Sequence, residues 1–201
     1  MKLIGLCGGS GSGKGVVCSL FSELGVPSID TDKVYHEMTC GPSPCLSALV
    51  DAFGSSVLKE DGSLNRVRLA NIVFADGADN KRRLLSKITH KFILERTDEI
   101  ASSYFNSGIG MVIVDAPLLF ESGYDKKCDC VISVVADEEL RISRIIARDG
   151  ISTDRAISRI SKQLGEDFLR SNSDFCIENN GDIDDLRNKV NEIYLKLNEM
   201  E

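Results

Sequence analysis

The strongest constraint on the fold is a glycine-rich segment near the N-terminus of this 201-residue chain. Residues 5–17 read GLCGGSGSGKGVV, between a short apolar run at 3–7 and a segment with helical spacing at 16–24. Glycine lets a backbone wrap closely around an anion, and the N-terminus of the following helix attracts negative charge. The sequence therefore predicts a phosphate-binding loop that contacts a nucleotide through Gly8, Gly11, Ser12, Gly13, Lys14, Gly15 and Val16.

The loop departs from the usual pattern at one position. Gly8, Gly13 and Lys14 have the spacing G-x-x-x-x-G-K, but Gly15 stands where a hydroxyl normally reaches Mg²⁺. We expect Lys14 to bridge the β- and γ-phosphates of the nucleotide. Because Mg²⁺ keeps several waters and is anchored largely by the phosphates, a water can fill the vacated position. Ser12 or Asp115 would hold that water.

Further apolar runs divide the rest of the chain into alternating segments. They cover residues 26–29, 111–115, 131–135 and 175–177, and helical segments separate them. The β-branched runs at 111–115 and 131–135 are typical of strands buried on both faces. This order, together with the predicted phosphate-binding loop, predicts an α/β fold with a parallel five-stranded sheet flanked by helices.

The stretch between the second and third strands is too long for a simple crossover. It has helical character at 67–74 and 80–104 and is rich in Arg and Lys. We expect an inserted helical subdomain over residues 34–107. The core would then consist of residues 1–33 and 108–201.

A basic segment at 138–148 predicts the cations of the site. Arg141, Arg144 and Arg148 recur at spacings of three and four, so they share one face of a helix. For Arg141 alone, a solvated face is the usual explanation. Phosphoryl transfer needs cations that neutralise the transferring group and exclude water, so we interpret residues 147–169 as a lid.

Carboxylates follow two of the predicted strands. Asp30 and Asp32 end the second strand and Asp115 ends the third. Ligands of open α/β sheets bind at that edge, where a carboxylate can accept a proton from a hydroxyl or hold Mg²⁺ through water. If the strand continues, Asp30 and Asp32 point to opposite faces, and the pattern leaves open which one faces the nucleotide.

Composition excludes several classes of protein. The net charge of −7 argues against a general nucleic-acid binder, and no apolar run approaches the roughly 18 residues of a membrane span. The N-terminus does not have the pattern of a secretory signal, so we expect a cytoplasmic protein. Seven cysteines without paired C-x-x-C spacing, and two histidines without metal-ligand spacing, indicate reduced thiols and no structural zinc.

The chain resembles the dephospho-CoA kinase family over almost its whole length. The matching segments are residues 5–14, 29–32 (IDTD), 64–66 (LNR) with 73–74, 114–121 (VDAPLLFE), 144–150, Arg159 with Gln163, and 174–179. The VDAPLLFE block is far more specific than the loop alone. The resemblance implies transfer of the γ-phosphate of ATP to the 3′-hydroxyl of dephospho-CoA, by a core, a helical CoA-binding domain and a lid.

The resemblance also implies roles for individual residues. Asp32 would be the catalytic base, Arg144 and Arg148 would lie near the nucleotide and the lid, and Asn179 would lie on the adenine side. The acceptor site would include Asp32, Arg66, His90, Asp115, Pro117 and Leu118.

Three positions depart from the family pattern. Gly15 replaces Ser or Thr, Lys91 replaces the Pro that usually follows the histidine, and Leu169 stands roughly where the lid often has Lys. Because Gly15 and Leu169 remove groups that touch metal or phosphate, an impaired nucleotide-binding protein is one alternative. Another nucleoside or nucleotide kinase of the same fold is a second. The presence of Lys14 and Asp32 favours an active kinase that uses ATP, Mg²⁺ and dephospho-CoA, without a nucleic-acid or membrane partner; we expect a monomer, and oligomers stay open.

Overall fold

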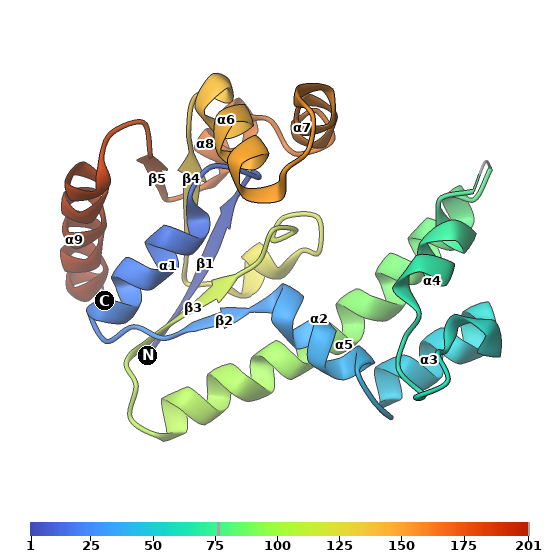
Figure 1. Ribbon diagram of the computed structural model, residues 1–201. Helices are drawn as coiled ribbons and strands as arrows, with labels where there is room; N and C mark the ends of the chain where they lie inside the picture. The colour runs from blue at the N-terminus through green and yellow to red at the C-terminus, as the bar shows by residue number, and fades with distance from the viewer. Residues whose placement is uncertain (76, 201) are drawn as a thin grey trace. The chain divides into compact units, whose positions relative to one another are not determined.

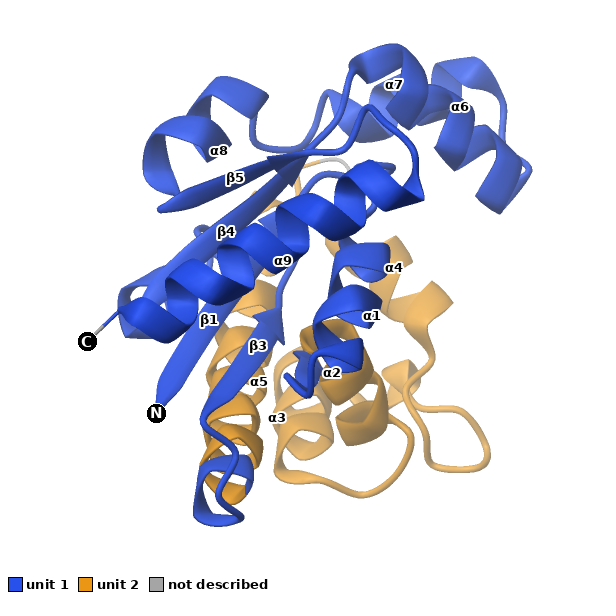
Figure 2. Cartoon of the chain, turned by 90° about the vertical axis from the view of Figure 1, so that its left-hand side faces the viewer, with its two compact units in different colours: residues 1–29, 104–201 blue, residues 30–103 orange. Residues whose placement is uncertain are grey.

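The computed structural model describes residues 1–75 and 77–200. Figure 2 shows its two compact units, Met1–Ile29 with Tyr104–Glu201 (unit 1) and Asp30–Ser103 (unit 2). The predicted insertion at 34–107 overlaps unit 2 almost completely. Its role in binding CoA stays a prediction.

A five-stranded sheet has the order β2-β3-β1-β4-β5 (Figure 1). The strands are β1 Lys2–Gly8, β2 Ser28–Asp30, β3 Met111–Asp115, β4 Cys130–Val135 and β5 Phe175–Glu178. All are parallel, and the predicted fold class is confirmed. The register sets Asp115 opposite Leu6, near the carboxyl end of β1, where the glycine-rich loop begins.

The helices of unit 1 begin with α1, which directly follows this loop. They are α1 Lys14–Glu23, α6 Glu138–Asp149, α7 Thr153–Ile160, α8 Glu166–Asn172 and α9 Ile183–Glu199, with the short 3₁₀ helix η2 Tyr124–Lys127. The carboxyl edge of the sheet therefore meets both the start of α1 and the α6–α8 segment, where the sequence predicts the nucleotide-binding and lid residues.

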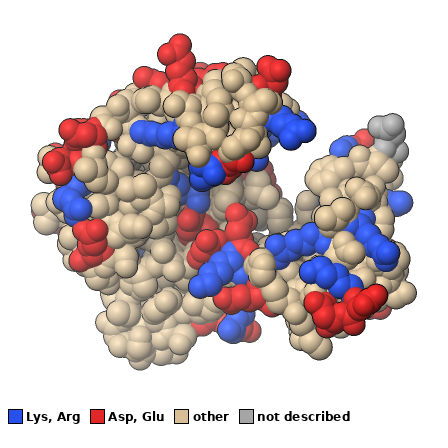
Figure 3. Space-filling view, in the orientation of Figure 1, with Lys and Arg blue, Asp and Glu red and all other residues tan. Residues whose placement is uncertain are grey.

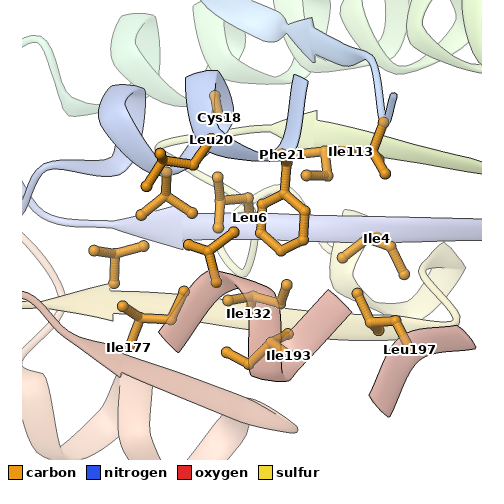
Figure 4. Packing of buried hydrophobic residues seen from close by; sticks show 14 of the residues in the cluster. Ile4, Leu6, Cys18, Leu20, Phe21, Ile113, Ile132, Ile177, Ile193 and Leu197 are labelled. Carbon is orange, nitrogen blue, oxygen red and sulfur yellow. The ribbon is translucent and has the colours of Figure 1, made fainter. Parts of the chain in front are cut away.

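One face of the sheet is covered by α1 and α9. Figure 4 shows Leu6 of β1 and Ile132 of β4 between Phe21 of α1 and Ile193 of α9. The buried positions of both helices recur every three or four residues, which is the spacing of one apolar helix face. This packing fixes the start of α1, and with it the lysine that closes the glycine-rich loop.

Unit 2 is helical and has its own core. Its elements are α2 Thr31–Thr39, α3 Pro44–Phe53, the 3₁₀ helix η1 Ser55–Val57, α4 Arg66–Val73 and α5 Asp79–Asn106, whose last residues belong to unit 1. Leu46 and Leu49 of α3 pack with Leu69 and Val73 of α4. Helix α5 continues through His90 and Lys91 without a break, since Lys91 permits a backbone hydrogen bond that Pro would remove.

Candidate active site

The glycine-rich loop needs glycine at two positions that combine a left-handed backbone with close contact to neighbouring elements. Gly11 and Gly13 have left-handed φ values of 79° and 94°. A Cβ on Gly11 would lie 2.5 Å from the Arg141 carbonyl oxygen, and one on Gly13 would lie 2.1 Å from Nδ2 of Asn179. The loop is therefore packed from behind, and its conformation excludes side chains at both positions.

Arg144 and Asn179 hold the loop through its carbonyl groups. Arg144 donates to the carbonyl oxygens of Gly11 (3.3 Å) and Asn179 (3.0 Å). The Asn179 side chain is 6% exposed and donates to the carbonyl oxygen of Ser12 at 2.7 Å. In this structure both side chains support the loop, while the adenine-side role of Asn179 stays a prediction.

Arg141 and Gln163 fasten the tip of the loop. Arg141 Nε donates to the Ser10 carbonyl at 3.0 Å, and its Nη2 donates to Gln163 Oε1 at 3.0 Å. The same Oε1 accepts from the Ser10 amide at 2.9 Å. Arg141 is half-buried, and this burial lowers the pKa of its guanidinium. The usual explanation of such a stripe, a solvated helix face, does not describe Arg141, because its side chain is half-buried against the loop.

Lys14 and Asp115 form an ion pair where the loop meets the end of β3. Their side chains are 16% and 13% exposed. The thiol of Cys18, one turn after Lys14 on α1, lies 3.5 Å from the second carboxylate oxygen of Asp115. The structure thus brings together a cation and a carboxylate that the sequence places 101 residues apart.

The buried hydroxyl of Ser12 is the group in the loop best suited to bind a water or a ligand oxygen. Ser12 is 1% exposed, and its Oγ has no hydrogen-bond partner among the described residues. A buried hydroxyl without a partner is costly, so such a group marks a place where a water or ligand oxygen can bind. Oxygen donors of Ser12 and Asp115 also suit Mg²⁺, which prefers oxygen ligands and retained waters.

Arg148 lies apart from the loop that Arg144 contacts. It is exposed and forms two hydrogen bonds with Asp149, at 2.7 and 3.0 Å. Arg159 of α7 also pairs with Asp149. The two arginines together lower the pKa of the Asp149 carboxyl to about 2, with Arg148 the larger cause. This cluster joins the end of α6 to α7.

The end of the predicted lid, by contrast, is fixed to the sheet. Leu169 of α8 is 6% exposed, and Arg170 pairs with Glu178 of β5 at 2.6 Å. The hydrophobic side chain at 169 therefore contributes to packing. In the α7 region, Arg155, Arg159 and Lys162 surround a cavity of about 500 Å³. Together with Arg148, they are exposed basic side chains of the predicted lid.

Asp30 and Asp32 have different surroundings in unit 2, because Asp30 caps a helix and Asp32 lies within it. The carboxylate of Asp30 caps α2, accepting from the amides of Asp32 (2.9 Å) and Lys33 (3.0 Å). The strand ends at Asp30 and the helix begins at Thr31. Asp30 and Asp32 therefore do not lie on opposite faces of one continuing strand. Asp32 is exposed in the first turn of α2.

The other predicted acceptor residues divide between the units. Arg66 of unit 2 donates to Thr39 Oγ1 at 3.2 Å and lies over the Tyr35 ring, 5.6 Å from its centroid. His90 is half-buried in α5. In unit 1, Pro117 and Leu118 are exposed just after β3. Arg66 therefore has a fixed orientation at the surface of unit 2.

Some functional contacts escaped the sequence analysis. Gln163 contacts Ser10 across 153 residues, and Cys18 contacts Asp115 across 97. No local pattern indicates the contact of Gln163 with Ser10. The spacing of Cys18, four residues after Lys14, was the signal that could have placed its side chain on the same helix face.

Comparisons with known proteins agree with this geometry. A family model described as dephospho-CoA kinase matches residues 2–185. A dephospho-CoA kinase of Syntrophotalea carbinolica is 35% identical over 98% of this chain and 92% of its own. A crystal structure of a Thermus thermophilus protein has a TM-score of 0.82 and 28% identity, covering 98% of this chain and 97% of that one. The structure of dephospho-CoA kinase from Campylobacter jejuni has a TM-score of 0.71 and 25% identity, covering 97% of this chain and 96% of that one.

Among the described residues, no helix is long and apolar enough to cross a membrane.

Proposed function

This chain belongs to the dephospho-CoA kinase family, and from that premise we propose how its residues divide the work of phosphoryl transfer. The reaction is that of an ATP-dependent kinase acting on dephospho-CoA, which gives coenzyme A and ADP. The observation that carries the proposal is the Lys14–Asp115 pair beside a glycine-rich loop at the carboxyl edge of the sheet.

The loop and Lys14 bind the phosphates of ATP. Amides of the loop and of the N-terminus of α1, including those of Gly8, Gly11, Gly13, Gly15 and Val16, face the anion, and the glycines let the backbone approach it closely. Lys14 exchanges its bond to Asp115 for bonds to the β- and γ-phosphates. Arg141, Gln163 and Asn179 hold the backbone of the loop in its conformation before the nucleotide binds.

Mg²⁺ fits the oxygen donors of this site. We propose that Ser12 and Asp115 hold it, through water, beside the phosphates of ATP. When bound, the ion neutralises charge on the phosphates.

Asp32 acts on the acceptor. Its carboxylate orients the 3′-hydroxyl of dephospho-CoA and accepts its proton late in a loose transition state. Arg66, His90, Pro117 and Leu118 contribute to acceptor binding. Arg144 and Arg148 supply positive charge, and for Arg148 this requires an exchange of its partner Asp149. Closure of the lid excludes water and limits hydrolysis of ATP.

A coupled assay of ADP release tests the proposed function. We expect release in ATP and Mg²⁺ to depend on added dephospho-CoA, and to be far slower with adenosine or nucleoside monophosphates. A preference for either of those acceptors would identify another kinase of the same fold. Failure of every acceptor, with ATP still bound, would identify an impaired nucleotide-binding protein. A cytoplasmic location and a monomeric state stay predictions.

Replacing Arg66 by Ala is expected to raise the KM for dephospho-CoA about tenfold and that for ATP much less. The reason is that a positioned guanidinium forms charge-assisted bonds with the acceptor's phosphates. Steady-state kinetics with each substrate varied in turn measures the two constants. Arg68→Ala is the matched control, since Arg68 is on the same helix but bonds to the Ser56 carbonyl at 3.2 Å. Equal changes in both KM values would remove Arg66 from the acceptor site.

Gly15→Ser is expected to lower the Mg²⁺ concentration for half-maximal activity about 2- to 10-fold and to raise turnover. A Cβ at Gly15 meets nothing within 4 Å, so the hydroxyl fits and can replace a water near the metal. This factor in Mg²⁺ concentration corresponds to the free energy of about one hydrogen bond. A magnesium titration of both proteins provides the measurement.

Gly15→Ala separates the hydroxyl from the backbone effect. It should stabilise the first turn of α1 by less than about 1 kcal/mol, as Ser does to a smaller extent, without changing the titration. If Ser leaves the titration unchanged or impairs catalysis, the proposal that a water replaces the missing hydroxyl is wrong.

A further inference from the structure

The end of helix α2 carries a cysteine and a histidine in contact. Sγ of Cys40 lies 3.0 Å from Nδ1 of His36, one helical turn earlier. Both residues are exposed. In the tautomer with Nδ1 unprotonated, the imidazole accepts a hydrogen bond from the thiol, and a thiol beside such a base is the arrangement found in nucleophilic cysteines. The proposed phosphoryl transfer uses neither residue.

The other cysteines are shielded to different degrees. Cys40 is the exposed one of the seven, whereas Cys7, Cys18, Cys45 and Cys130 are buried and Cys128 and Cys176 are partly buried. Burial raises the pKa of Cys7, Cys128 and Cys130 to about 12. Because the thiolate is the reactive form, these three react poorly at neutral pH. A reagent in solution therefore meets Cys40 first.

Cys40 and His36 open into a cavity of about 320 Å³ within unit 2. Lys59 and Arg66 also line it, and none of its described lining residues is a carboxylate. Arg66 is held there by its bond to Thr39. Figure 3 shows Lys and Arg side chains on the surface of unit 2, with a group of Asp and Glu side chains beside them. A ligand that places an anionic group in this cavity would bring its other end to the thiol.

We propose that Cys40 is a site of thiol–disulfide exchange with small disulfides that carry anionic groups. His36 takes the thiol proton, and the thiolate attacks one sulfur of the disulfide. The sulfur–sulfur bond of the small molecule breaks, a bond forms between Cys40 and one half, and the other half leaves as a thiol with the proton. Cys40 is oxidised and one half of the disulfide is reduced. Lys59 and Arg66 attract the anionic groups.

The test is a comparison of three small disulfides. Glutathione disulfide is anionic, 2-hydroxyethyl disulfide is neutral and cystamine is cationic. We expect glutathione disulfide to give one adduct, located at Cys40 by peptide mass spectrometry and reversed by a reducing agent. Rates should fall in the order anionic, neutral, cationic, after correction for the rate of each disulfide with a free cysteine derivative.

Two variants separate the two parts of the proposal. His36→Gln should slow exchange with all three disulfides about fivefold, the order of one hydrogen bond. Lys59→Gln should slow the anionic reagent alone, about two- to fivefold, the usual effect of one exposed charge. Lys33→Gln, an exposed lysine of α2 outside the cavity lining, is the matched control and should change nothing.

The outcomes are independent of kinase activity, because adduct formation is read by mass. A first adduct at Cys128 or Cys176, or equal corrected rates for the three disulfides, would overturn the proposal. So would an unchanged rate in His36→Gln. Cys40→Ser should abolish the adduct, and the location of the adduct in the unmodified sequence remains decisive if that variant folds poorly.

Discussion

Asp32→Asn is expected to lower kcat about 10²–10⁴-fold, the usual contribution of a positioned general base. The amide keeps the size of the carboxylate but cannot accept the proton of the 3′-hydroxyl. ATP binding should hardly change, because the phosphates are held by the loop and Lys14. Turnover in the coupled assay and the Kd for ATP measure the two quantities.

Asp30 provides a matched control for this variant. Its carboxylate accepts from the amides of Asp32 and Lys33, and Asn is an equally good residue for capping a helix. Asp30→Asn should therefore keep most of the activity. If Asp32→Asn retained more than about half of its turnover, Asp32 would be the wrong base. The next candidate would be Asp30 if Asp30→Asn lost the activity, and Asp115 if it did not.

Lys14→Met is expected to lower kcat/KM for ATP about 10²–10³-fold, by removing a donor aimed at charge in the transition state. It also leaves the Asp115 carboxylate facing the phosphates without its partner. The free energy of unfolding should also fall, by about 1–3 kcal/mol, because both side chains are largely buried and the variant leaves the Asp115 carboxylate without Lys14. Kinetics and thermal unfolding of the same preparation separate the catalytic effect from the structural one.

Lys2→Met is the matched control, which tests whether the fall in kcat/KM for ATP is specific to the lysine of the loop. Lys2 lies at the other end of β1, where its amino group donates to the Leu197 carbonyl at 2.5 Å. We expect this variant to keep kcat/KM for ATP. A normal kcat/KM in Lys14→Met would show that the loop binds phosphate without the lysine.

Much of the fold follows from short-range patterns. The run at 111–115 forms β3 with the predicted bounds, because continuous β-branched residues suit a strand covered on both faces. Helix α3 had a local signal that the sequence analysis did not use. Ser43 caps it through the Leu46 amide, and Pro44 occupies the first turn.

The sequence predicted those site residues that belong to a motif with a single known chemical role. The G-x-x-x-x-G-K spacing placed Lys14, and the strand ends placed Asp115. Long-range packing decides the rest: Arg141 is half-buried because the loop closes over it, which a helical stripe of arginines does not reveal. Likewise, Asp30 and Asp32 look equivalent as strand-end carboxylates until α2 begins between them.

The most direct test of the account is a single-turnover reaction with ATP, Mg²⁺ and dephospho-CoA, followed by ³¹P nuclear magnetic resonance. The account predicts that each ADP formed is matched by one new phosphate monoester on the ribose 3′-oxygen, and that Asp32→Asn slows both signals together. ADP formed together with inorganic phosphate, or a phosphate on another position of the acceptor, would contradict it.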